Sequence, residues 1–124
     1  MALTHISVRI GNPARPTRFA QVKFLVDSGA IYSVVPARTL ERLGVKPHSR
    51  RTFLLADGSE MTRQMGDAVF RLDGRQGASP VIFGKKGDHA LLGAVTLESL
   101  GMLLDPLRRE LRPLPMVLAP RIPR

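Results

Sequence analysis

The sequence contains no cysteine, which excludes disulfide bonds, thiolate catalysis and metal sites with cysteine ligands. This composition fits a reducing compartment, and we expect a cytoplasmic protein. The chain begins without a basic segment followed by an apolar run, so we predict no secretory signal. Its most apolar stretch, residues 90–107, is interrupted by Glu98, Asp105 and Pro106, and we do not expect it to span a membrane.

Aromatic residues are scarce, at 5% of the chain, with one tyrosine and no tryptophan. The core must therefore be built mainly from aliphatic residues, methionine and phenylalanine. Hydrophobic residues make up 44% of the 124 positions, which is enough to bury the core of one domain.

Acidic residues are also few: 10 Asp and Glu stand against 19 Lys and Arg, which gives a net charge of +9. Such an excess can indicate nucleic-acid binding. The tightest basic pairs, at 50–51, 85–86 and 108–109, lie far apart in the sequence and have no aromatic residue among them on which a base could stack. We therefore favour an ordinary solvated surface. A nucleic-acid-binding β-barrel is the third interpretation, and strong salt-sensitive affinity would support it.

Hydrophobic alternation and turn residues predict many short strands. The predicted strands cover residues 6–10, 19–26, 52–55, 61–72, 81–83 and 90–92, with a late hairpin of 102–104 and 110–114. Short helices are predicted at 36–43 and 96–100, each followed by a glycine. These elements predict an all-β, closed barrel-like domain over residues 1–114 with one or two short helices. Residues 115–124 carry three prolines, and we expect them to form a loosely ordered tail.

The segment from Phe24 to Ala30 places a carboxylate, Asp27, directly after an apolar strand. Ser28, Gly29 and Ala30 are small, so the backbone can turn tightly and approach a substrate or another chain. A carboxylate at the edge of an apolar core has a shifted protonation equilibrium, which suits acid–base chemistry. Taken alone, however, Asp-Ser-Gly is typical of an ordinary turn, because Asp and Ser bond to their own backbone.

A second pattern changes that interpretation. Leu91-Leu92-Gly93 precedes a predicted helix, and Gly93 stands 66 positions after Asp27 (93 − 27). Together the two patterns resemble the retroviral-like (retropepsin-type) aspartic proteases and their single-domain bacterial relatives. In that family an apolar strand leads into Asp-Thr/Ser-Gly-Ala, and a later apolar pair precedes a glycine and a helix. The likeness covers about residues 5–114, and its combination of motifs is more specific than any one of them.

The resemblance implies a single-lobe acid protease fold that is active as a homodimer, with Asp27 and its symmetry mate as the catalytic pair. It places Ser28, Gly29 and Ala30 in support of the carboxylate. A mobile flap is implied at Leu55, Ala56, Asp57, Gly58 and Ser59, and we expect an apolar substrate pocket formed by Ile31, Val34, Leu54, Met61 and Leu91. The implied substrate is an extended peptide, and neither a cofactor nor a metal ion is implied.

The sequence departs from the family at one contact. Many retropepsins place an arginine directly after the second glycine, paired with an aspartate two residues past the catalytic glycine. Here those positions are Ala94 and Ile31, so both charges are absent together and none is left without a partner. We expect apolar packing to hold the dimer instead. The alternative function is a catalytically inactive dimerisation or peptide-binding module with the same fold.

Other polar residues carry weaker predictions. His5, His48 and His89 lack the spacing of metal ligands, and we expect surface or loop positions for them. Asp88 stands close to Leu91-Leu92-Gly93, but the dyad chemistry does not need it. Asp105 precedes Pro106 and is predicted to form a turn.

Overall fold

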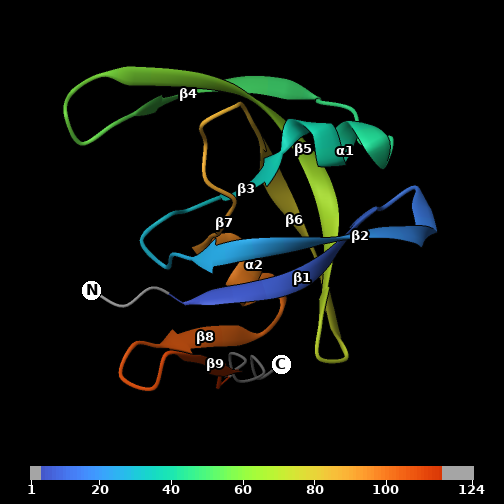
Figure 1. Ribbon diagram of the computed structural model, residues 1–124, viewed down its shortest axis with the longest axis vertical. Coiled ribbons are helices and arrows are strands. Elements are labelled where there is room, and N and C mark those ends of the chain that lie inside the picture. The colour runs from blue at the N-terminus through green and yellow to red at the C-terminus, as the bar shows by residue number, and fades with distance from the viewer. Residues whose placement is uncertain (1–3, 116–124) are drawn as a thin grey trace, which may run out of the picture.

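The computed structural model describes residues 4–115, which form nine strands and two short helices (Figure 1). In chain order the elements are β1 (His5–Asn12), β2 (Arg15–Val26), β3 (Ser33–Pro36), α1 (Ala37–Arg42), β4 (Ser49–Leu54), β5 (Glu60–Leu72), β6 (Arg75–Gly84), β7 (Leu91–Leu92), α2 (Ala94–Ser99), β8 (Met102–Asp105) and β9 (Glu110–Pro113). Most of the tail predicted at residues 115–124 lies outside the described residues. Neither helix in the described range is long and apolar enough to cross a membrane.

Seven strands form one sheet that closes on itself. Their order is β1-β2-β7-β3-β6-β5-β4, and β1 also pairs with β5 at positions Arg9–Gly11. Six strands therefore make a closed ring, and β4 extends from β5 outside it. The β4–β5 hairpin arches away from the ring, while β8 and β9 form a separate two-stranded sheet at the other end (Figure 1). This confirms the predicted mostly-β, barrel-like domain with two short helices.

The core lies inside the ring and is built from the apolar residues of the alternating apolar–polar pattern that predicted the strands. Val8 and Ile10 of β1 are buried, as are Phe24 and Val26 of β2. The ring of Phe24 lies 6.1 Å from that of Phe70, centroid to centroid, at a tilted angle. Because aromatic residues are so few, most of the remaining core consists of leucine and valine side chains from β3, β6, β7 and the two helices.

Two strands differ from the sequence predictions. β3 was not predicted, because its first three residues are all buried and show no alternation. β6 was predicted only at 81–83 but begins at Arg75. Its first half is made of small and polar residues, and the reason is steric: a Cβ added at Gly77 would lie 2.5 Å from the carbonyl oxygen of Ser99 at the end of α2. The close approach of α2 requires small residues there and hides the strand from a hydrophobicity pattern.

The smaller differences are at element ends. β2 begins at Arg15 rather than residue 19, β7 contains only Leu91–Leu92, and α2 begins at Ala94, two residues before its predicted start. The predicted hairpin of β8 and β9 is confirmed. Asp105 forms its turn as predicted, because its Oδ1 accepts hydrogen bonds from the backbone N–H groups of Leu107 and Arg108 at 3.0 and 3.2 Å.

Candidate active site

Asp27 stands at the end of β2, where the strand leaves the sheet. β2 runs parallel to β7, with Val26 opposite Leu92, and the Asp27 N–H donates to the Leu92 carbonyl at 3.0 Å. Both Val26 and Leu92 are buried, whereas Asp27 is exposed. Its Oδ1 accepts a hydrogen bond from the Gly29 N–H at 3.0 Å, and its carbonyl accepts one from the Ala30 N–H at 3.1 Å. The turn therefore orients the carboxylate and keeps it accessible.

The loop after Asp27 is tied to the start of α2. The N–H of Ala94 donates to the Ala30 carbonyl at 2.8 Å, and the N–H of Val95 donates to the Ile31 carbonyl at 3.0 Å. Gly93 allows this contact, since an added Cβ would lie 2.7 Å from the Tyr32 carbonyl carbon. These backbone bonds join the two segments at the positions where the family's ion pair is absent.

A buried hydroxyl cluster lies beneath this junction. The hydroxyl of Thr96 is bonded to Ser33 Oγ and, at 2.9 Å, to Ser79 Oγ. Ser33 Oγ in turn accepts the Gly93 N–H at 2.9 Å. All three hydroxyl residues are buried, and their bonds join β3, β6 and α2 below the aspartate loop. This cluster was not predicted from the sequence; the available signal was a hydroxyl residue, Ser33 or Thr96, within each of two otherwise apolar segments.

A cleft of about 300 Å³ opens next to the aspartate loop. Its lining residues are Gly29, Ala30, Ile31, Tyr32, Val34, Phe53, Met61, Ile82 and Leu91. Four of the five predicted pocket residues are among them. Leu54 is not, and its side chain is 76% exposed near the end of the hairpin.

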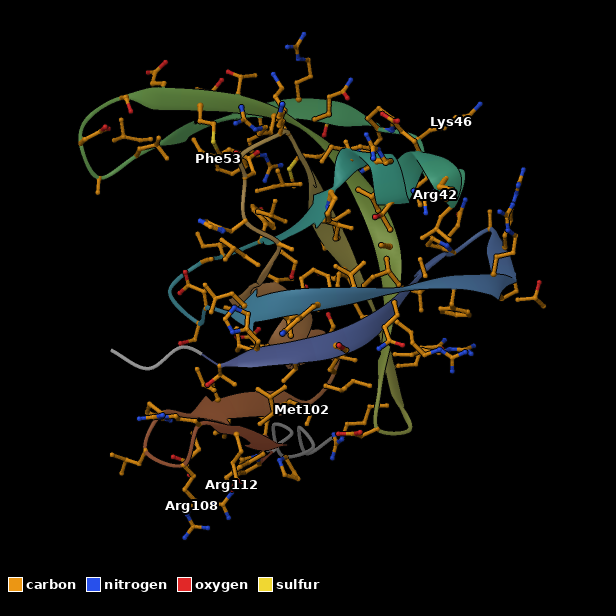
Figure 2. All side chains as sticks on the ribbon, in the orientation of Figure 1. Arg42, Lys46, Phe53, Met102, Arg108 and Arg112 are labelled. Carbon is orange, nitrogen blue, oxygen red and sulfur yellow. The ribbon has the colours of Figure 1, made fainter. Side chains whose placement is uncertain are left out.

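Tyr32, Phe53 and Ile82 line the cleft but were not predicted. The rings of Tyr32 and Phe53 meet edge to face, 6.3 Å apart. Figure 2 shows Phe53 on the side of the β4–β5 hairpin that faces the body of the molecule. Phe53 could have been found from its pairing across the hairpin with Met61, which the Asp57-Gly58 turn implies. The cleft therefore lies between the floor that carries Asp27 and the hairpin above it.

The five residues Leu55–Ser59, predicted as a flap, form the turn of this hairpin. The Leu55 N–H donates to the Ser59 carbonyl at 2.8 Å, and Gly58 adopts a positive φ of 87°. Asp57 Oδ1 accepts the Ser59 side-chain hydroxyl and, at 2.9 Å, its backbone N–H. These two hydrogen bonds hold the pKa of Asp57 below its usual value. Asp57 therefore forms the turn of the segment that the resemblance implies as a flap.

Asp88 anchors the loop between β6 and β7. Its two carboxylate oxygens accept hydrogen bonds from Arg63 Nε at 2.8 Å and Nη2 at 3.0 Å, and Oδ2 also accepts the Lys85 N–H at 2.8 Å. The hydrogen bond from Arg63 is the main reason that the pKa of Asp88 lies below its usual value. This pair fastens the loop to β5 and is structural.

The histidines are exposed, as predicted, and no three His, Asp or Glu side chains within residues 4–115 gather as metal ligands would. The basic residues are spread over the surface: Arg42 and Lys46 lie by α1, while Arg108 and Arg112 lie at the far end on the β8–β9 hairpin (Figure 2).

Some of the arginines stack on aromatic rings, in contacts that form only in the folded chain and were not predicted. The guanidinium groups of Arg9 and Arg71 lie 5.7 and 4.2 Å from the Phe19 ring centroid, and that of Arg51 lies 5.3 Å from the Tyr32 centroid.

Comparison with known proteins now decides the family. A family model described as aspartyl protease matches residues 6–96. The chain belongs to the aspartyl protease family. The matched range includes the Asp27 turn, the β4–β5 hairpin and the junction at Gly93, which are the elements that form the site described above. No curated protein sequence matches the chain.

The fold of this aspartyl protease family member is similar to that of solved retroviral and retroviral-like proteases. The retroviral protease-like domain of Ddi1 from Leishmania major is 24% identical, with a TM-score of 0.58 over 91% of this chain and 89% of that one. EIAV protease complexed with the inhibitor HBY-793 is 19% identical, with a TM-score of 0.56 over 81% and 89%. Simian foamy virus (mac) protease is 20% identical, with a TM-score of 0.50 over 75% and 92%. The predicted retropepsin-like fold is thereby confirmed.

Proposed function

We propose that the protein is an aspartic endopeptidase that acts as a homodimer, with Asp27 of each copy in one shared site. The observation that carries this proposal is the placement of Asp27. It is exposed and directly follows the buried end of β2, its Oδ1 is bonded to the Gly29 N–H, and its loop borders an apolar cleft under a hairpin.

The chemistry requires two carboxylates that share one proton. Two like charges a few Å apart do not both ionise readily, so the pair titrates as a unit and holds one carboxylate ionised and one protonated. The ionised Asp27 takes a proton from a water molecule, whose oxygen attacks the scissile carbonyl carbon. The protonated mate donates a hydrogen bond to the carbonyl oxygen. A proton then passes to the departing amine as the C–N bond breaks.

One chain supplies one such carboxylate turn, so the site is complete only in a dimer. Exposed large hydrophobic side chains support an interface on the side of the molecule that carries Asp27. Ile31 is 65% exposed in the aspartate loop, Leu54 is 76% exposed in the β4–β5 hairpin, and Leu107 is 93% exposed in the β8–β9 turn. All three loops project from the left side of the molecule in Figure 1. Exposed apolar groups gathered on one side of a domain are typical of an interaction surface.

The remaining predicted site residues take supporting roles in the dimer. Ser28 bonds across the two-fold axis to the partner backbone, and Gly29 leaves room for the substrate backbone. The β4–β5 hairpin closes over an extended peptide, which pairs in a β-like manner between hairpin and floor. The cleft then holds an apolar substrate side chain and excludes water from the reacting bond.

The test is Asp27→Asn, an isosteric change that removes the titratable group. We expect a fall in peptide cleavage of at least about 10³-fold, because neither acid nor base catalysis remains. Digestion of a peptide library measures the activity, and sedimentation together with circular dichroism checks that dimer and fold are intact.

Exposed Asp67, which lies on β5 outside the cleft, provides the matched control, since Asp67→Asn makes the same chemical change away from the site. If Asp27→Asn cleaves as fast as the parent, the proposal is wrong. If neither the parent nor the variants cleave any library peptide but the chain dimerises and binds peptides, the inactive peptide-binding module is the correct function.

A further inference from the structure

The face of the β4–β5 hairpin that is turned toward the cleft carries two arginines. Cross-strand pairing sets Arg51 opposite Arg63 and Phe53 opposite Met61. These four side chains share one face, because residues two apart on a strand point to the same side. Since Phe53 and Met61 line the cleft, Arg51 and Arg63 lie on the cleft side, two cross-strand pairs farther from the hairpin turn.

The two arginines differ in how their charge is compensated. Like charges directly opposite each other on a sheet repel. Arg63 is neutralised by its two hydrogen bonds to Asp88. Arg51 is exposed and has no carboxylate within ion-pair distance in residues 4–115. It is therefore the cation on this face whose charge the described part of the chain leaves without a counterion.

Arg51 is nevertheless held in place at the edge of the cleft. Its Nη1 donates a hydrogen bond to the Tyr32 hydroxyl at 2.6 Å, and its guanidinium lies over the Tyr32 ring. Tyr32 lines the cleft and meets Phe53 edge to face. A guanidinium has five N–H donors, and the contact with Tyr32 uses one of them. The other donors bond to no side chain or backbone group within residues 4–115, and they can bind a group that approaches the cleft.

We infer that Arg51 is a specificity residue, which selects peptides that place a carboxylate beside the bulky apolar side chain held in the cleft. This inference rests on the proposed function and adds a substrate class to it. The planar guanidinium of Arg51 can donate two parallel hydrogen bonds to one carboxylate. Because the contact with Tyr32 already holds the Arg51 side chain in place, less side-chain entropy is lost when a peptide binds. A carboxylate there also gives Arg51 the counterion that Asp88 already provides for Arg63.

The experiment uses a set of end-blocked peptides that share a central pair of apolar residues. Each peptide carries one glutamate at a different flanking position, and each is compared with the same peptide in which glutamine replaces the glutamate. We expect kcat/KM to favour glutamate by about three- to ten-fold at one position, as for a partly exposed charge pair. Raising the salt concentration should reduce this preference. Peptides with a free C-terminal carboxylate and no glutamate separate a terminal carboxylate from a side-chain carboxylate as the recognised group.

Variants at two neighbouring arginines sharpen the test. Arg51→Gln should abolish the preference, Arg51→Lys should keep part of it, and Arg51→Glu should reverse it in favour of lysine peptides. The control is Arg50→Gln, because this substitution removes the same charge from the hairpin but at a side chain that points to the opposite face of β4. That variant should leave the preference unchanged.

Binding of the same peptides to the Asp27→Asn protein separates this inference from the proposed activity. Glutamate-selective, Arg51-dependent binding without any cleavage by the parent would refute the protease function and support the specificity site. Cleavage with equal rates for glutamate and glutamine would refute the inference alone, as would a preference that Arg50→Gln and Arg51→Gln reduce equally. Peptides that are neither cleaved nor bound would overturn both.

Discussion

The two sides of the cleft are built differently. The floor, made of β2, β3, β7 and the first turn of α2, is buried on its inner side and is held by backbone bonds between segments that lie far apart in the sequence. The hairpin arm, made of β4 and the facing half of β5, is mostly exposed: in β4 only Phe53 is partly buried. Its strand pairing and one turn hold it together.

The difference separates two tasks. A catalytic carboxylate needs a fixed position, and the floor provides one through close packing that allows a single backbone path. Substrate entry needs a segment that opens, and such segments have few buried contacts. In the proposed function the floor therefore determines stability and chemistry, whereas the hairpin arm determines access and substrate selection. Equivalent changes on the two sides should therefore have unequal effects on the free energy of unfolding.

The largest difference is expected between two glycines. Gly93→Ala in the floor places a Cβ 2.7 to 2.9 Å from backbone atoms of Tyr32 and Ile31, which cannot move aside as a side chain would. We expect a loss of about 3 kcal/mol in the free energy of unfolding. Urea denaturation at a fixed chain concentration measures it, since dimerisation makes stability depend on concentration.

Gly58→Ala in the hairpin turn is the matched control. The added Cβ would meet nothing within 4 Å, and the penalty comes only from the positive φ of 87°. That strain is about 1 kcal/mol and acts on the turn alone. Equal losses for the two variants would mean that floor and hairpin arm do not differ in the way described.

A smaller difference is expected between two threonines. Thr96→Val keeps the shape of the side chain but removes the hydroxyl that bonds Ser33 and Ser79 in a buried cluster. Ser33 then keeps only its bond from the Gly93 N–H, and Ser79 keeps only its bond to the Pro80 carbonyl. The loss of two buried hydrogen bonds should cost about 1–2 kcal/mol. The measurement is the shift in the urea midpoint relative to the parent.

Thr52→Val makes the same change in the hairpin arm, where Thr52 is bonded to Thr62 at 2.8 Å in an exposed pair. Water replaces that bond, so the loss should stay below about 0.5 kcal/mol. A larger effect of Thr52→Val than of Thr96→Val would contradict the assignment of stability to the floor.

A further change tests the ion pair that ties the hairpin arm to the loop between β6 and β7. Asp88→Asn removes the charge that holds Arg63, and we expect a loss of about 1 kcal/mol near pH 7. The pKa of Asp88 is lowered in the folded state, so its contribution is present above the unfolded pKa and is lost as pH falls through the folded value. Urea midpoints of parent and variant should therefore converge as pH falls below about 4. A difference that stays constant down to pH 3 would show that the charge is not the cause.

Much of the fold could be predicted from local patterns. β1 and the buried half of β2 follow from their alternation of apolar and polar residues, and the turn at Asp57-Gly58 follows from residues that favour it. β3 and the first half of β6 could not be predicted, because tertiary contacts rather than local patterns determine which residues occur there. Gly77 is small because α2 lies against it, and nothing within β6 itself carries that information.

The candidate site shows the same division. Asp27 was predicted as a site residue because it follows an apolar strand and because Gly93 stands later in the chain. Both features can be seen in the sequence, since they reflect residue types that the local backbone requires. The hydroxyl cluster and the contact between Arg51 and Tyr32 join residues 63 and 19 positions apart. Such contacts depend on strand register, which the sequence patterns did not provide. For this reason Tyr32 and Phe53 were missed while Val34 and Met61 were identified.

The central claim is that one active site contains Asp27 from two copies of the chain. Mixing parent and Asp27→Asn chains, unfolding them together and refolding them at constant total concentration tests it directly. If both copies are required, activity follows the square of the parent fraction, so an equal mixture retains about one quarter of the parent activity. Activity that falls in simple proportion to the parent fraction, to about one half, would mean that each chain carries a complete site and would contradict the claim.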